Sequence, residues 1–208
     1  VWAGMAKETA HQLGTPLSSL QGWVEILKES PGNEKIAAEM SKDVDRLKLV
    51  SDRFGKIGST PQLEESDILR QIHQMVQYLK RRAPEKVEFD VKSSLSEVMV
   101  MVNPPLFDWV MENLLKNALD AMESTGSISI QVIQEPAKVI VDVTDTGKGI
   151  LKKNIPMVFK PGFSTKKRGW GLGLSLSKRI IEQYHRGVLM VKHSEPGKGT
   201  TFRIELPR

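Results

Sequence analysis

Residues 138–150 read KVIVDVTDTGKGI, a run of β-branched residues that ends in an aspartate and two glycines. The run 138–145 is typical of a β-strand, because branched side chains pack well on a pleated surface. A carboxylate at a strand end can accept a hydrogen bond from an exocyclic amine, and Gly147 and Gly149 let the backbone turn tightly beside a ligand. Taken alone, Asp-x-Gly-x-Gly is more often a turn that ends a strand, so its meaning depends on the rest of the chain.

The same β-like texture recurs on both sides of this stretch. Further β-like runs fall at 87–91, 98–102, 127–134, 188–193 and 200–206. Helical patterns lie between them at 67–82, 104–122 and 172–184. Ser66 and Asp67 are suited to capping the first of these helices, and Pro104-Pro105 suits the start of the second. Strands with interspersed helices predict an α/β sandwich in which helices cover one face of a sheet.

Two longer helical stripes precede this region. Apolar residues recur at three- and four-residue steps over 4–29 and again over 36–57, separated by the break SPGN at 30–33. Pro16 should kink the first helix. Two such helices form an antiparallel hairpin with too little interior to bury both stripes, and a second copy would complete a four-helix bundle. The chain is therefore predicted to be α+β and to dimerise through residues 1–60.

The bulk composition excludes several classes of protein. The 208 residues are 39% hydrophobic and 26% charged, which is ordinary for a globular chain. No apolar run approaches the roughly 20 residues of a membrane helix, and no signal-peptide pattern is present. The absence of cysteine excludes disulfides and thiolate metal sites and fits a reducing compartment. The chain begins at Val1 directly in a helical pattern, so we expect it to be part of a longer protein.

The net charge of +5 is too small to indicate nucleic acid, and we expect no nucleic-acid partner. Much of the excess is local and comprises Lys148, Lys152, Lys153, Lys160, Lys166, Lys167 and Arg168. Charge alone favours a solvated loop, and the alternative is a loop that approaches phosphates. Residues 146–170 have little periodicity, and such a long irregular stretch in a compact domain is often a functional lid.

Two further motifs favour a loop that approaches phosphates over a solvated loop. The stretch GWGLGL at 169–174 opens a helix, where backbone N–H groups and the helix dipole attract anions. It does not follow a strand closely, so the dinucleotide-binding fingerprint is not expected. Asn113 and Asn117 share one face of the helix predicted at 104–122, and their amide oxygens suit Mg²⁺ beside phosphates. Because much of that helix should be buried, its amides need partners.

The stretch AHQLGTPL at 10–17 places His11 away from the apolar stripe of its helix. A neutral imidazole, with an ordinary pKa of about 6.5, is a competent nucleophile near neutral pH. Most histidines of this kind are surface residues of a helix with no such role, and His73, His185 and His193 are interpreted in that way.

Taken in this order, the motifs resemble sensor histidine kinases of bacterial two-component systems, whose nucleotide domain shares its fold with gyrase-type ATPases. The resemblance covers nearly the whole chain. Residues 1–60 resemble the dimerisation and histidine phosphotransfer domain, 61–66 a linker, and 67–208 the catalytic ATP-binding domain. The matching boxes are AHQLGTPL at 10–17, ENLLKNA at 112–118, DTGKG at 145–149, FKPGF at 159–163, GWGLG at 169–173 and GKGTTF at 197–202.

The resemblance implies Mg²⁺-ATP binding in the C-terminal domain. Asp145 would hold adenine with help from Gly149 and Thr200. Asn117 would ligate Mg²⁺, Asn113 would act near the phosphates, and Lys166 would reach a phosphate oxygen. Phe159 and Phe163 would pin the lid. The other residues expected at the nucleotide are Lys116, Gly147, Gly169, Gly171, Leu172 and Gly173.

The resemblance also implies autophosphorylation on His11, followed by transfer to an aspartate on a response-regulator receiver domain. Thr15, one helical turn after His11, implies dephosphorylation of that regulator as well. The whole protein is expected to be anchored in the bacterial inner membrane, with this segment cytoplasmic and without membrane contact. Phosphorylation within or across the dimer remains open, since the loop at 30–34 decides it.

Two residues depart from the wider pattern. Gln12 follows His11 where most members of the family carry Glu or Asp, and an amide cannot serve as a base. Hydrolysing gyrase-type ATPases usually carry Glu at position 113, so Asn113 favours transfer to a side chain over hydrolysis. Glu112 would point about 100° away around the helix.

Three alternative functions share the same nucleotide fold. A gyrase-type ATP-driven clamp is disfavoured by Asn113 and by the box around His11. A pseudokinase scaffold is disfavoured by the intact Asn117, Asp145 and glycine boxes, although Gln12 keeps it open. A serine/threonine kinase would have no need for His11 on a dimeric bundle.

Overall fold

The computed structural model describes residues 2–57, 61–166 and 171–208, and in the two N-terminal helices it describes the side chains of residues 13, 16–45, 47, 48 and 51. The chain divides into two compact units, Val1–Pro61 and Gln62–Arg208. We call the first the helical unit and the second the sheet unit.

The helical unit is a hairpin of helices α1 (Trp2–Lys28) and α2 (Glu34–Ile57). Both helices begin and end within about two residues of the predicted stripes, and α1 remains helical on both sides of Pro16. Few of the described apolar side chains are buried in the hairpin, and they are Leu17, Val24, Ala37 and Val44. The hairpin alone therefore has a thin interior.

The sheet unit contains a five-stranded sheet in the order β2-β4-β5-β7-β6. The strands are β2 (Val87–Ser93), β4 (Gly126–Gln134), β5 (Lys138–Asp145), β6 (Val188–Glu195) and β7 (Gly199–Pro207). β2 and β4 pair in parallel, and the other pairs are antiparallel. β5 is thus the central strand, as its continuous β-branched run suggests.

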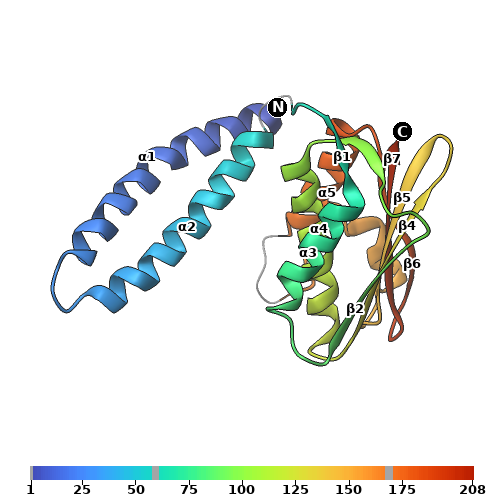
Figure 1. The fold of residues 1–208 in the computed structure, drawn as a ribbon. Coiled ribbons are helices and arrows are strands. Elements are labelled where there is room, and N and C mark those ends of the chain that lie inside the picture. The colour runs from blue at the N-terminus through green and yellow to red at the C-terminus, as the bar shows by residue number, and fades with distance from the viewer. Residues whose placement is uncertain (1, 58–60, 167–170) are drawn as a thin grey trace. The chain divides into compact units, whose positions relative to one another are not determined.

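Helices cover one face of this sheet (Figure 1). They are α3 (Ile68–Lys80), α4 (Pro104–Met122) and α5 (Gly173–Arg179), which continues into the π-helical turn η2 (Ile180–Tyr184). Alternate residues of β5, such as Val139, Val141 and Val143, point into the core with Phe107 of α4. The predicted α/β sandwich is confirmed, as are its strands and helices apart from small shifts of their ends.

The structure has a strand where the sequence suggested only a linker. β1 (Glu64–Asp67) pairs antiparallel with β3 (Met99–Val102), although residues 61–66 were assigned to a connection between domains. Asp67 anchors this ribbon, because its Oδ1 accepts hydrogen bonds from the N–H groups of Leu69 and Val98, both at 3.1 Å. The first bond is the helix cap predicted for α3. A short 3₁₀ helix, η1 (Lys152–Met157), also lies in the region without periodicity.

The open face of the sheet carries a buried carboxylate. Asp142 on β5 accepts hydrogen bonds from Arg203 Nε and Nη2, both at 2.8 Å, and from Lys192 Nζ at 2.8 Å. Burial works to raise the pKa of Asp142, but the hydrogen bonds and charges of Arg203 and Lys192 outweigh it and hold that pKa below its ordinary value. The group is therefore an ionised, paired charge.

The end of η2 is fixed by His185, which is only 1% exposed, so the surface position expected for this histidine is wrong. Its Nε2 accepts a hydrogen bond from Asn103 N–H at 3.0 Å, so Nδ1 carries the proton donated to Ile180 O at 2.9 Å. Burial lowers the pKa of His185, against the smaller opposing effect of these backbone bonds. Asn103 also caps α4 through its side chain and donates from Nδ2 to Gln62 O at 2.9 Å.

No helix in the described ranges has both the length and the apolar character needed to cross a membrane.

Candidate functional site

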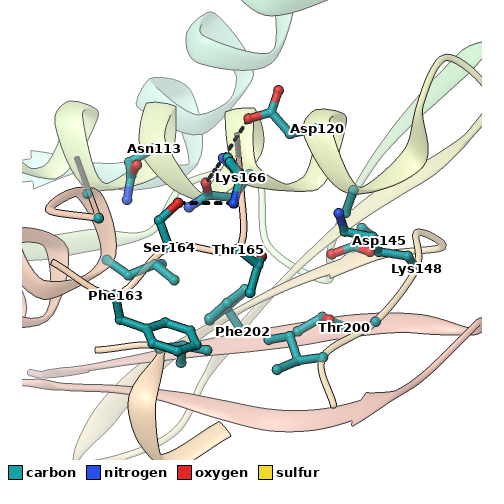
Figure 2. Close-up of a pocket in the computed structure, with 18 residues that line it drawn as sticks. Asn113, Asp120, Asp145, Lys148, Phe163, Ser164, Thr165, Lys166, Thr200 and Phe202 are labelled. Atoms are coloured by element: carbon teal, nitrogen blue, oxygen red, sulfur yellow. Dashed lines mark hydrogen bonds and ion pairs between the residues drawn. The ribbon is translucent and has the colours of Figure 1, made fainter. Parts of the chain in front are cut away.

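A cavity of about 240 Å³ lies between α4, the ends of β5 and β7, and the loop that joins η1 to α5 (Figure 2). Eight of the residues expected at the nucleotide line it, namely Asn113, Asn117, Asp145, Gly149, Lys166, Gly171, Gly173 and Thr200. These residues come from segments up to 87 positions apart in the chain, from Asn113 to Thr200. The fold therefore brings the separate boxes into one site.

Asp145 and Thr200 mark one end of the cavity (Figure 2). The Asp145 side chain ends β5 at 5% exposure, and its Oδ1 accepts a hydrogen bond from Gly147 N–H at 2.8 Å. Burial raises the pKa of Asp145, while backbone hydrogen bonds from Gly147 and Thr200 partly oppose the rise. A desolvated carboxyl group in this position is a strong acceptor for an amine in the cavity.

The loop after Asp145 is held in place by close backbone contacts. Gly149 has φ +69°, and a Cβ there would lie 2.1 Å from Glu195 O, so only glycine fits. Ile150 N–H donates to Ser194 Oγ at 2.8 Å, and that hydroxyl shares a hydrogen bond of 2.9 Å with Thr200 Oγ1. Ser194 thus connects the loop to β7, a role that no sequence motif indicates.

Asn113 lies toward the other end of the cavity, where α5 begins. Its Nδ2 donates to Ser177 Oγ at 2.9 Å. A Cβ at Gly173 would lie 2.4 Å from Asn113 Oδ1, so glycine at this position permits the close approach of α5 to α4. Gly171 has φ +65° and would collide with Gly162 if it carried a side chain.

Lys166 reaches from the loop onto α4 (Figure 2). Its Nζ donates to Asn117 Oδ1 at 2.7 Å and to Asp120 Oδ2 at 2.6 Å. Its backbone N–H donates to Ser164 Oγ at 3.1 Å. A cation and the Asn117 amide oxygen therefore meet at one point of the cavity.

Four residues expected at the nucleotide do not line the cavity. Lys116 Nζ turns back along α4 to Glu112 Oε1 at 2.6 Å, because the two residues are one helical turn apart. Phe159 packs edge-on against Phe202, with ring centroids 6.2 Å apart, and its role in pinning the lid stays a prediction. Gly147 lies against Ala121, where a Cβ would come within 2.7 Å, and Leu172 precedes the first turn of α5.

The cavity also contains residues beyond those expected at the nucleotide. Phe163, expected to pin the lid, lines the cavity itself. Asp120 lies three positions after Asn117 and hence on the same face of α4, a spacing that could have revealed it. The remainder include Lys148, Ile150, Val158, Leu174 and Phe202, most of which are apolar.

His11, Gln12 and Thr15 fall within α1, but their side chains lie outside the described residues, as does Gly169.

The groups that line the cavity suit a magnesium nucleoside triphosphate. A buried carboxyl group and a threonine lie at one end, apolar side chains follow, and two amides and a lysine lie at the other. Among the described residues no three His, Cys, Asp or Glu side chains gather as a metal cluster.

Comparison with known proteins places this fold in a family. Residues 103–208 match the family model described as histidine kinase-, DNA gyrase B- and HSP90-like ATPase. The chain is 34% identical to the sensor histidine kinase ZraS of Escherichia coli (strain K12) over 212 residues, covering 98% of this chain and 45% of ZraS. The chain thus spans less than half the length of that relative.

Solved structures give the same result. The catalytic domain of histidine kinase ThkA is similar with a TM-score of 0.63 and 27% identity, covering 70% of this chain and 95% of that domain. Histidine kinase ThkA in complex with the response regulator protein TrrA has a similar fold, with a TM-score of 0.62 and 23% identity over 98% of this chain and 61% of that one. The chain therefore belongs to the histidine kinase-, DNA gyrase B- and HSP90-like ATPase family, and the relatives it resembles within that family are sensor histidine kinases.

Proposed function

We propose that this chain is the kinase core of a two-component sensor, which phosphorylates itself on His11 and passes the phosphoryl group to a response-regulator aspartate. Residues 67–208 would be the catalytic ATP-binding domain. The observation that carries the proposal is the asymmetry of the cavity, with the Asp145 carboxyl group at one end and the Asn117 amide and Lys166 ammonium away from it.

Each end of the cavity suits one part of ATP. The Asp145 carboxylate would accept a hydrogen bond from the exocyclic amine of adenine, with Thr200 and Gly149 beside the base. Asn117 Oδ1 would ligate Mg²⁺, and Lys166 would bind a phosphate oxygen. When bound, the metal ion would neutralise charge on the phosphates.

The residues near Asn113 favour transfer to a side chain over hydrolysis. The Asn113 amide is bonded to Ser177 and cannot take a proton, and Glu112 is paired with Lys116 outside the cavity. Of the cavity's two carboxyl groups, Asp120 is bonded to Lys166 Nζ and Asp145 to Gly147 N–H. A carboxylate base for water is therefore missing from the position where hydrolysing relatives carry one.

His11 would attack the γ-phosphorus of ATP in line with the ADP leaving group, and catalysis would come mostly from positioning and charge neutralisation. Gln12 can orient the imidazole through a hydrogen bond but cannot accept its proton. We therefore propose slow autophosphorylation, with the proton passing to water or to another carboxylate.

The helical unit would supply the dimer. Large apolar side chains remain exposed on the hairpin, including Trp23 at 60%, and the others are Leu13, Leu20, Ile26, Ile36 and Leu47. Pairing with a second copy through residues 1–60 would bury them in a four-helix bundle. Residues 61–66 would connect this bundle to the catalytic domain.

A response-regulator receiver domain is the proposed partner of the bundle, and the solved complex of histidine kinase ThkA with the response regulator protein TrrA supports a partner of this class. Thr15 lies one turn after His11 and would place water for dephosphorylating the regulator. Thr15→Ala should therefore spare autophosphorylation and weaken phosphatase activity several-fold, as measured with the phosphorylated regulator. Equal loss of both activities would count against this role.

The function is tested by incubating the protein with γ-labelled Mg²⁺-ATP beside a His11→Gln control. Acid-labile label that disappears in the control is the expected result. Absence of label despite measurable ATP binding would overturn the kinase assignment and favour a scaffold that binds nucleotide. Gln12→Glu is the matched variant for the proton acceptor, and it should raise the rate.

A further inference from the structure

Asp120 is the cavity residue whose chemistry the proposed function leaves unexplained. It is one of the two carboxyl groups that line the cavity, and it lies beside the amides expected at the phosphates. A carboxylate there would repel a triphosphate unless a cation stood between them. The structure shows such a cation, because Lys166 Nζ lies 2.6 Å from Asp120 Oδ2.

The same ammonium group lies 2.7 Å from Asn117 Oδ1. Asn117 and Asp120 are three residues apart on α4, so their oxygens face the cavity together and converge on one point. An amide oxygen and a carboxylate oxygen form an oxygen donor set of the kind that Mg²⁺ prefers. We call the point between Asn117 Oδ1 and Asp120 Oδ2 the cation site.

Lys116 does not supply this cation. Lys116 is nearest in sequence, but its Nζ is bonded to Glu112 Oε1 and it does not line the cavity. Lys166 itself is 40% exposed and Asp120 56% exposed. Ion pairs with this much exposure are weak, so Lys166 can leave the cation site easily.

We propose that the cation site is shared by two alternative occupants, the Lys166 ammonium in the nucleotide-free protein and the Mg²⁺ ion of a bound nucleotide. Asp120 is then a metal-site residue in addition to Asn117. Arrival of the metal releases Lys166, and with it the loop that carries Ser164, toward the phosphates. The inference rests on the proposed nucleotide function and adds to it a coupling between the metal and the loop.

The first test measures affinity for AMPPNP by calorimetry, in Mg²⁺ and in excess EDTA, for the wild-type chain and Asp120→Asn. Loss of the carboxylate should reduce the enhancement of affinity by Mg²⁺ about tenfold, the size expected for one contact to a charged group. Affinity in EDTA should stay within about twofold, because without the metal the Lys166 ammonium stands between the carboxylate and the triphosphate. Glu123→Gln is the matched control, since it removes a carboxylate just beyond α4 from a residue that does not line the cavity.

The second test needs no nucleotide. Amide hydrogen exchange at 163–166 should be faster in Asp120→Asn and in Lys166→Met than in the wild-type chain, and unchanged in Glu123→Gln. Unaltered exchange in both variants, or wild-type dependence on Mg²⁺ in Asp120→Asn, would overturn the shared cation site. Failure of the wild-type chain to bind AMPPNP at all would instead overturn the proposed nucleotide function, while the exchange experiment would still test the contact of Lys166 with Asp120.

Discussion

The two units bury their apolar residues to different extents. In the sheet unit, β-strands and helices enclose a continuous core that includes Phe107 and Ile128, both fully buried. In the helical unit, four described apolar side chains are buried, while large ones such as Trp23 and Leu47 stay exposed. The sheet unit has an interior of its own, whereas the hairpin reaches comparable burial only against another surface. The stability of the sheet unit should therefore depend on one chain alone, whereas that of the helical unit should depend on assembly with another surface.

The largest effect is expected when a large side chain is truncated in the core of the sheet unit. Phe107→Ala should lower the free energy of unfolding of the sheet unit by about 3–5 kcal/mol, through lost burial and a cavity. Trp23→Ala is the matched change in the hairpin. It should leave the unfolding of the sheet unit unchanged and weaken self-association instead. Calorimetry measures the unfolding of both variants, and light scattering at several protein concentrations measures their self-association. If Trp23→Ala destabilised the sheet unit as much as Phe107→Ala does, the contrast between the two units would be refuted.

A second substitution tests whether the polar face of the sheet contributes to its stability. Arg203→Met should cost about 3 kcal/mol, because it leaves the Asp142 carboxylate buried with only Lys192 as a partner. Since the pKa of Asp142 is lowered on folding, this contribution is present above the ordinary pKa of about 3.9 and is lost as pH falls through the folded value.

Urea unfolding at pH 7 and at pH 3 measures this contribution. Lys138→Met removes a more exposed partner of Glu205 on the same sheet and should cost at most about 1 kcal/mol. Equal losses for the two variants, or an Arg203→Met loss that is as large at pH 3 as at pH 7, would contradict the assignment.

A third substitution separates binding from stability within the sheet unit. Asp145→Asn should weaken nucleotide binding about 10–100-fold, because it replaces a charged acceptor for the adenine amine. It should not lower the melting temperature. Burial raises the pKa of Asp145, so the ionised group disfavours the folded state as pH rises through that value. Binding titrations and thermal unfolding on one sample test both parts, with exposed Asp90→Asn as control.

The smallest effect is a pH dependence that originates at His185. The pKa of this buried ring is lowered on folding, so below its ordinary value of about 6.5 the unfolded chain binds a proton that the folded chain does not. Stability should therefore fall as pH decreases from 7.5 to 5.5, and less so in His185→Gln. His193→Gln, which changes an exposed ring, should keep the wild-type slope.

The sequence predicted the fold well because its core strands and helices carry strong periodic signals. β5 and α4 appear at their expected positions, since β-branched runs and a proline-initiated apolar helix leave few alternatives. β1 was missed because the four residues EESD resemble a polar connection. Its pairing depends on β3 and on the Asp67 contacts, which come from 31 residues away.

Cavity-lining residues are predicted from the sequence where the side chain has no competing partner nearby. They are missed, or predicted wrongly, where a contact with another side chain decides the position. Asp145 and Asn117 line the cavity as expected. Lys116 belongs to the same helical box as Asn117, but its ammonium group pairs with Glu112. The i,i+4 spacing places these two side chains together on the helix, and this contact competes with a position at the cavity. Asp120 is not predicted from the sequence, although it lies one turn from Asn117. The box contains only the two asparagines, and the function of Asp120 depends on Lys166, which is 46 residues away.

The order of strands in the sheet has a consequence for synthesis of the chain. β7 lies between β5 and β6, so the sheet cannot be completed until the ribosome has released residues up to Pro207. At about 5–20 residues per second, the hairpin emerges roughly 7–30 s before that strand. During this interval the exposed side chains of α1 and α2 are available to a neighbouring nascent chain on the same messenger RNA. Assembly of two subunits would then precede completion of the nucleotide site.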